Sequence, residues 1–332
     1  MKNKCDSFKA IEIRESGDLV SSIEEKYSRL DYEYFQNFRS EHTIKSYRND
    51  IQKFWEFMSD NFQEILNVNS LERVHLVAYR NWQQDNDFAP KTINRKLSSL
   101  SSYFDFLIEK NIMESNPVLN VRRPRQEVVK ETNDLTDQQI KALFDVLNTK
   151  THAIYLHRAV IYVLFSTGIR KSELIYLKRK NYIEINGHKV IEIVAKGGKH
   201  LTKVIHPICA EIIDNYLDWM ENQGRGHESE DWLFQPTKNP STPSELNRPL
   251  GPKSVDYIVK TYAKKAGITE NISPHSARAS YIGSALEAGG DLLKVSIDVG
   301  HSSVRTTQEY NKRRQKISES PAYDLGYFKK TS

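Results

Sequence analysis

Cysteine is scarce in this 332-residue chain, which has only Cys5 and Cys209. Two thiols are too few for a disulfide framework or a cysteine-rich zinc site, and they fit a reducing compartment. No apolar run approaches the ~18 residues that a membrane span needs, and no apolar core of a signal peptide follows Met1. We therefore expect a cytoplasmic protein that does not contact a membrane.

The signatures of nucleotide and metal chemistry are also missing. The chain has no Gly-x-x-x-x-Gly-Lys-Ser/Thr string to cradle nucleotide phosphates and no acidic cluster suited to magnesium. We therefore expect no metal and no other cofactor. Any bond chemistry must then come from the side chains themselves.

Positive charge exceeds negative charge only slightly, with 48 Lys and Arg against 43 Asp and Glu and a formal net charge of +5. So small an excess does not by itself establish a nucleic-acid partner. A single basic run is commonly a solvated helix face, but five runs on both halves of the chain favour a polyanion. These runs are Lys45, Arg48 and Lys53; Lys91, Arg95 and Lys96; Arg122, Arg123 and Arg125; Lys171, Lys178, Arg179 and Lys180; and Lys312, Arg313 and Arg314.

The length is about twice that of a usual single domain, which predicts two domains with separate cores. Residues 1–40 form an N-terminal extension, in which 23–38 fit a helix but no role is evident. We then expect a helical domain at 41–113, a linker at 114–133, and a second domain at 134–332 with a tail at 315–332.

Apolar residues recur at helical spacing through the first domain. They predict helices over 43–58, with Thr43 as the N-cap, over 71–82, and over 91–108, where Pro90 is the start signal. The polar faces of this helical unit are expected to carry Lys45, Arg48, Arg95 and Lys96.

The linker breaks this periodicity with Asn116-Pro117 and then Arg122-Arg123-Pro124-Arg125. One interpretation is an ordinary solvated connector. The other is a strap across a DNA backbone, in which the arginines contact phosphates and position the two domains.

The second domain is predicted to be mainly helical with a small antiparallel sheet. Thr136 caps its first helix, and an apolar helix over 156–166 ends at Gly168. Three short strands at 182–185, 190–194 and 203–205 follow, joined by turns at Asn186-Gly187 and Gly197-Gly198. Further helices are expected over 209–221 and 252–266, with a loop containing Pro236, Pro240 and Pro243 between them.

Ser273 and Pro274 form a helix start, which places His275 and Arg278 on one face of the first turn. The free N–H groups and the positive dipole at a helix N-terminus attract phosphate, and these two side chains add donors and charge. The pair alone is weak evidence, because two surface residues near a helix start would give the same pattern.

Four more residues have a plain structural interpretation beside the functional one. Arg170 lies just past a helix end, where it could simply pair with Glu173, and Lys196 lies in a hairpin turn. His301 comes just before an apparent helix that carries Tyr310, one of 17 tyrosines. None of them identifies a site when taken alone.

Their order along the chain is far more specific than any single residue. The strings Thr-Gly-Ile-Arg-Lys-Ser-Glu-Leu, Lys-Gly-Gly-Lys, Ser-Pro-His-Ser-Ala-Arg and Gly-His-Ser-Ser-Val-Arg-Thr-Thr-Gln-Glu-Tyr together resemble the tyrosine recombinases, also called the phage integrase family. The resemblance covers about 135–314, and the helical unit resembles the family's core-binding domain. It implies the two-domain recombinase architecture.

The resemblance also implies a role for each residue. It makes Arg170 and Arg278 the phosphate-clamping arginines, Lys196 the hairpin lysine, and Glu173 an acidic support. The remaining site residues are His275, His301 and the nucleophile Tyr310, and we assign DNA contacts to Lys45, Arg48, Lys91, Arg95, Lys96, Arg122, Arg123 and Arg125. The chain departs from the family pattern at Ala277 and Ala279, where leucine and histidine are common, and at Asn311-Lys312, where Thr-His is common.

The implied activity is site-specific DNA recombination through a 3′-phosphotyrosyl intermediate and a Holliday junction. The implied partners are double-stranded DNA with inverted-repeat binding arms, a tetramer of this chain or of related recombinase subunits, and an accessory protein. Integration or excision of a mobile element and resolution of chromosome dimers both fit. A monomeric type IB topoisomerase and a DNA-binding protein without catalysis are the alternatives; the complete set of six catalytic positions argues against the second.

Overall fold

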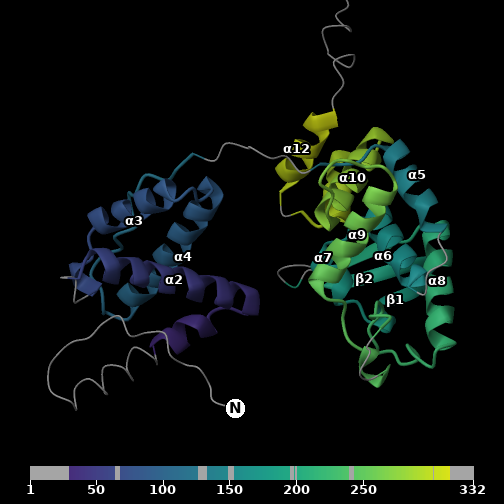
Figure 1. Cartoon of the computed structure of the whole chain (residues 1–332), viewed down its shortest axis with the longest axis horizontal. Helices are drawn as coiled ribbons and strands as arrows, with labels where there is room; N and C mark the ends of the chain where they lie inside the picture. The colour runs from purple at the N-terminus through teal and green to yellow at the C-terminus, as the bar shows by residue number, and fades with distance from the viewer. Residues whose placement is uncertain are drawn as a thin grey trace, which may run out of the picture. The chain divides into compact units, whose positions relative to one another are not determined.

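The computed structural model describes residues 30–63, 68–125, 133–148, 153–194, 198, 200–238, 243–301 and 303–314. The chain divides into two compact units, Met1–Val129 and Lys130–Ser332. Among the described helices, none is long and apolar enough to cross a membrane. The mainly helical architecture with one small sheet confirms the predicted fold class (Figure 1).

The first unit is helical, as predicted. Its long helices are α2 (Glu41–Asn61), α3 (Arg73–Asp85) and α4 (Pro90–Glu109), with the 3-10 turn η1 (Val68–Ser70) and a helix that includes residues 30–36. Ser40, rather than Thr43, caps α2, because the Ser40 hydroxyl accepts a hydrogen bond from the Thr43 N–H. Pro90 occupies the first turn of α4, as its start signal predicted.

Aromatic rings fill the core of this unit. Phe54, Tyr79 and Phe104 are completely buried, and the Phe54 ring meets the other two edge-on at centroid distances of 5.2 and 5.9 Å. Such ring pairs add to the stabilisation from burial alone. The first part of the expected linker packs here as well, because Val118 and Val121 are buried in the same core.

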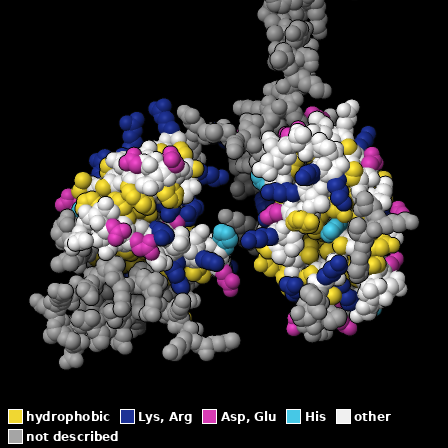
Figure 2. Space-filling model, viewed as in Figure 1, with side chains coloured by type: hydrophobic (Ala, Val, Ile, Leu, Met, Phe, Trp, Pro, Cys, Tyr) yellow, Lys and Arg dark blue, Asp and Glu magenta, His cyan; other side chains and the backbone are white. Residues whose placement is uncertain are grey.

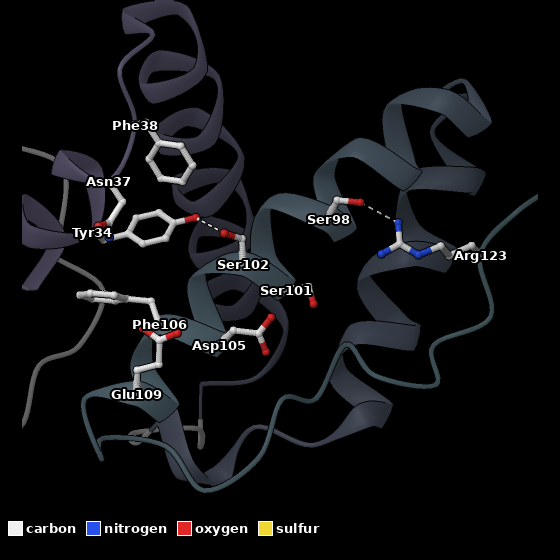
Figure 3. Close-up of a pocket in the computed structure, with 10 residues that line it drawn as sticks. All are labelled: Tyr34, Asn37, Phe38, Ser98, Ser101, Ser102, Asp105, Phe106, Glu109 and Arg123. Carbon is white, nitrogen blue, oxygen red and sulfur yellow. Dashed lines mark hydrogen bonds between the residues drawn. The ribbon is translucent and has the colours of Figure 1, made fainter. Parts of the chain in front are cut away.

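An open groove runs along one side of the first unit, between α4 and the helix at 30–36 (Figure 3). The Tyr34 hydroxyl donates to Ser102 Oγ at 3.1 Å, and Arg123 donates to Ser98 Oγ at 2.8 Å. The groove is lined by Tyr34, Asn37, Phe38, Ser98, Ser101, Ser102, Asp105, Phe106, Glu109 and Arg123. The carboxylates of Asp105 and Glu109 make this groove unsuitable for binding a DNA backbone, because like charges repel.

The second unit is built around helix α6 (Ile154–Thr167), which is buried along most of its length. Helices α8 (Pro207–Glu221), α9 (Pro252–Lys265) and α10 (Pro274–Glu287) pack against it. The remaining helices are α5 (Asp137–Asp145), α7 (Lys171–Ile175), α11 (Leu292–Asp298) and α12 (Val304–Arg314), with 3-10 turns η2 (Val146–Asn148), η3 (Arg179–Asn181) and η4 (Pro243–Leu246). Helices α7 and α11 are absent from the sequence prediction.

The sheet of the second unit is an antiparallel meander in the order β1-β2-β3. Strand β1 spans Tyr182–Ile185, β2 spans His188–Val194 and β3 spans His200–Val204. Asn186 and Gly187 have φ angles of 50° and 77°, so the first turn has the left-handed geometry that the Asn-Gly pair predicted. Strand β3 begins three residues before its predicted start.

Candidate active site

Arg278 lies deep in the second unit, near the start of α10. Ser273 caps this helix and Pro274 occupies its first turn, as the sequence predicted. The Arg278 side chain is nearly inaccessible, with 2% of the residue exposed. Its Nη1 donates to the Gly168 carbonyl at 2.8 Å and its Nη2 to the Val299 carbonyl at 2.5 Å. Burial, and then the charge of Arg170, lower the pKa of Arg278 to about 10, so it remains charged at neutral pH.

Arg170 lies between two helices, three residues after α6 ends, and is the N-cap of α7. Glu173 holds it at both ends: the Arg170 N–H donates to Glu173 Oε2 at 2.8 Å, and Nη1 donates to Oε1 at 2.7 Å. Arg170 Nη2 donates to the Gly300 carbonyl at 3.0 Å. One third of the side chain is exposed (33%), so this guanidinium is accessible to a ligand.

Two glycines allow the backbone to reach these guanidinium groups. Gly168 ends α6 with a φ of +59°, and a Cβ at this position would lie 2.6 Å from the Tyr281 ring. Gly300 has a φ of +65°, and a Cβ there would lie 2.5 Å from Leu201. Only glycine adopts this conformation readily and leaves the space empty.

Tyr310 projects from α12 into the same region as α10. The residue is 9% exposed and packs in a small apolar cluster with Ala279, Ile282, Val295 and Val299. Its hydroxyl lies 3.5 Å from His275 Nε2, at the outer limit of a hydrogen bond. The phenol and the imidazole are therefore adjacent.

His301 completes this group from the segment between α11 and α12. Its Nδ1 lies 2.8 Å from Thr307 Oγ1, and its ring is nearly parallel to that of Tyr310, with centroids 6.2 Å apart. Burial, followed by the charges of Arg278 and Arg170, lowers the pKa of His301 to about 4. His301 is therefore neutral at neutral pH.

Lys196 lies outside the described residues. It belongs to the connection between β2, which ends at Val194, and β3, which begins at His200. The structure thus brings together five of the six predicted catalytic side chains, with Glu173 beside them. Two guanidinium groups, a phenol and two imidazoles form a cationic cluster that can bind one phosphate and supply a nucleophile to it.

Family models match both units. The model described as "Phage integrase family" matches residues 133–316, more than half of the chain, and "Phage integrase, N-terminal SAM-like domain" matches 32–111. The chain belongs to the phage integrase family. It is a tyrosine recombinase, as the order of the motifs predicted.

Named relatives support the same assignment. Tyrosine recombinase XerD of Vibrio cholerae is 27% identical over 282 residues, which cover 85% of this chain and 89% of the relative. Tyrosine recombinase XerC of Staphylococcus saprophyticus is 27% identical over 272 residues, covering 82% and 86%.

Solved structures share the recombinase fold. XerH bound to palindromic difH substrate, a post-cleavage complex, superposes with a TM-score of 0.68 at 19% identity, covering 84% of this chain and 79% of that one. A lambda integrase dimer bound to a COC′ core site superposes with a TM-score of 0.64 at 16% identity, covering 87% and 95%. Both neighbours are DNA complexes.

The basic residues that the sequence assigned to DNA have different surroundings in this recombinase. Seven of the eight are exposed: Lys45, Arg48, Lys91, Arg95, Arg122, Arg123 and Arg125. Figure 2 shows exposed Lys and Arg side chains on both units. Lys96 lies inside the first unit rather than on its polar face, with a side chain only 7% exposed and its Nζ 3.9 Å from Asp50. The completely buried Asp50 also accepts hydrogen bonds from Arg95 and Ser99.

One of the five basic runs has most of its charge neutralised. Lys171 pairs with Asp256 at 2.9 Å, Arg179 with Glu221 at 2.9 Å, and Lys180 with Glu230 at 2.5 Å. The carboxylates that pair with these residues are distant in the sequence, so a count of basic residues does not reveal them. The sequence therefore overestimated the positive charge that this run offers to DNA.

The sequence missed several residues next to the site. The Gly168, Val299 and Gly300 carbonyls hold the arginines, and Thr307 contacts His301. One sequence signal could have indicated a further residue. In the alternating pattern of β3, Lys203 falls on the same inward face as the buried Leu201, where a lysine is unusual.

Proposed function

We propose that this chain is a site-specific DNA recombinase that cleaves and rejoins DNA through a 3′-phosphotyrosyl intermediate. The observation that supports this most is that Arg170, Arg278, His275, His301 and Tyr310 lie together in one unit. A single polypeptide then supplies both the phosphate clamp and the nucleophile.

The two arginines bind the non-bridging oxygens of the scissile phosphate. Their guanidinium groups are held by carbonyls and by Glu173, so they need little reorganisation when charge builds up on phosphorus. Phosphodiester cleavage requires roughly 20 kcal/mol of barrier lowering, and one preorganised donor contributes only about 3–4 kcal/mol. Several groups must therefore act on the same phosphate.

Tyr310 is the nucleophile of this reaction. Its oxygen attacks phosphorus and forms the phosphotyrosyl bond, while the phenolic proton passes to His275, the nearest described base, 3.5 Å away. The bond from phosphorus to the 5′ oxygen breaks, and Lys196 protonates that oxygen. His301 donates a hydrogen bond to a non-bridging oxygen.

Rejoining reverses these steps. A 5′-hydroxyl from another strand attacks the phosphotyrosine, and Tyr310 leaves with its proton restored. Because the ester conserves the energy of the broken bond, the exchange uses neither ATP nor a metal.

Strand exchange between two duplexes proceeds through a Holliday junction and requires four protomers. We propose a tetramer of this chain, or of this chain with a related recombinase, on sites with inverted arms, together with an accessory protein. The structural neighbour XerH is bound to a palindromic substrate, which is consistent with inverted arms. The reaction serves mobile-element integration or excision, or resolution of chromosome dimers, and phosphotyrosyl junctions mapped on random genomic fragments would identify the target site.

A Tyr310→Phe variant tests the nucleophile directly. It should bind DNA as the parent does but form no covalent adduct on a nicked duplex that traps the cleaved state, as measured by a denaturing gel. Tyr257→Phe is the matched control, because Tyr257 is 67% exposed on α9, and it should form adduct at the parental rate. Adduct that persists in Tyr310→Phe would overturn the assignment.

A further inference from the structure

Strand β3 buries a lysine and exposes a valine. Lys203 is 2% exposed and lies opposite the buried Ile191 of β2 in the strand register, whereas the following Val204 is 64% exposed. A register shift of one residue would reverse these environments, and burial of an ammonium group costs several kcal/mol unless a partner offsets it. The observed register also buries Leu201, but the buried ammonium group still needs a partner that offsets its cost.

Lys203 is held in a small polar network. Its Nζ lies 2.8 Å from Asp298 Oδ2, and the Tyr281 hydroxyl donates to the same oxygen at 2.8 Å. The Lys203 ammonium lies 5.6 Å from the centre of the Tyr281 ring. Three elements meet here, since the residues come from β3, α10 and the last position of α11.

The network adjoins the carbonyls that hold both active-site arginines. Asp298 directly precedes Val299 and Gly300, whose carbonyls accept from Arg278 at 2.5 Å and from Arg170 at 3.0 Å. The third carbonyl, that of Gly168, accepts from Arg278 at 2.8 Å, and Gly168 packs against the ring of Tyr281.

Strand β3 also abuts this segment through its other inward residue. Leu201 lies where a Cβ on Gly300 would be, so β3 contacts the segment at both Asp298 and Gly300. The 298–300 segment is thus held by two residues of β3 and, through Asp298, by Tyr281.

We propose that Lys203 is a positioning residue for the phosphate clamp: through Asp298, and with Tyr281, it sets the carbonyls that orient Arg170 and Arg278. This inference rests on the proposed function. It adds a residue that touches neither DNA nor the reacting atoms but determines how well the arginines fit the transition state.

A Lys203→Met variant removes the ammonium and keeps the length of the side chain. We expect covalent adduct to form about 10–100-fold more slowly, because displacements of about 1 Å at reacting groups have effects of this size. Lys189→Met is the matched control: Lys189 is on β2, 3.8 Å from Glu184 and 5.4 Å from the Tyr182 ring, with a side chain 38% exposed. It should react at the parental rate.

The nature of the leaving group separates a clamp defect from a hairpin defect. A substrate with sulfur in place of the bridging 5′ oxygen releases a thiolate, which needs no proton. It should rescue Lys196→Ala but leave Lys203→Met slow, because the arginines are still misplaced. Rescue of Lys203→Met by sulfur, or a parental rate with oxygen, would overturn the inference. If the parent itself forms no adduct, the proposed function fails instead.

Two further variants test the inference if Lys203→Met does not fold. Tyr281→Phe removes one hydrogen bond to Asp298 and should slow adduct formation with either leaving group by a smaller factor. Lys203→Met/Asp298→Asn removes both charges and should be no slower than Lys203→Met alone, since both changes break the same link. Thermal unfolding of each variant confirms that folded protein is compared, and additive losses in the double variant would refute a shared role.

Discussion

Backbone oxygens orient the two site arginines at least as much as acids do. Arg278 has two carbonyl partners, and Arg170 has one besides Glu173. Carbonyl partners leave the guanidinium charge largely uncompensated, which suits a site that must receive a phosphate. Burial, and after it the same uncompensated charge, lowers the pKa of His301.

The pKa of His301 predicts a specific pH dependence of stability. The folded protein holds this pKa at about 4, below the ordinary value of 6.5, so protonation is harder in the folded state. The unfolded chain therefore takes up the proton first, and His301 lowers the free energy of unfolding as the pH falls from about 6.5 towards about 4.

Urea unfolding of the parent and of His301→Gln at pH 7 and pH 5 measures this contribution. The parent should lose more stability than the variant between the two pH values, since glutamine does not titrate. Equal losses would show that His301 does not titrate in this range. Phosphate binding should oppose the effect, because an anion beside His301 favours its protonated form.

At the scale of elements, the long helices could be predicted from the sequence and the short ones could not. The long helices α2, α4, α6 and α10 were predictable from apolar periodicity and from start signals such as Pro90 and Ser273-Pro274. Helices α7 and α11 have five and seven residues, which is too short for a periodic pattern to stand out. Both matter to the site, because Arg170 is the N-cap of α7 and Asp298 is the last residue of α11.

The site residues were predictable only as a set. Arg170, His275, Arg278, His301 and Tyr310 could be chosen because their order matches a family, not because any local pattern was decisive. Lys203 was not predicted, because its burial depends on the register of β3 and on an acid 95 positions away. Lys96 was misplaced on a polar face for a similar reason: Asp50, its buried partner, lies on another helix.

Gly168, at the junction between α6 and α7, supports the site through its backbone conformation. Gly168→Ala would place a methyl group against Tyr281 and would force a side chain into left-handed backbone. We expect a loss of roughly 2–5 kcal/mol, from about 1–2 kcal/mol of backbone strain plus about 1–3 kcal/mol of overpacking. Because Gly168 also supplies a carbonyl to Arg278, adduct formation should slow as well.

Gly267→Ala is the matched control for this prediction. Gly267 follows α9 with a φ of +75°, but a Cβ there would meet nothing within 4 Å, so only the backbone strain remains. Thermal or urea unfolding compares the two variants. Equal destabilisation would show that contact with Tyr281 does not constrain the α6–α7 junction.

At the scale of the whole molecule, each of the two units carries basic side chains. The first unit contributes exposed arginines and lysines, and the second contributes the arginine pair of the active site. Most of the Lys171–Lys180 run is paired with carboxylates, so the electrostatic contribution to DNA binding should come from fewer residues than the composition implies.

Salt dependence measures how many of these residues contact phosphates. Each neutralised phosphate adds about 0.9 to the slope of log affinity against log salt, and loss of one contact should reduce the slope by that amount. Lys91→Met and Lys96→Met are a matched pair on α4, one exposed and one buried against Asp50. Lys91→Met should lower the slope by about 0.9, whereas Lys96→Met should leave it unchanged. Fluorescence anisotropy with a labelled duplex over a salt series tests both, and a reduced slope in Lys96→Met would place that ammonium on the DNA.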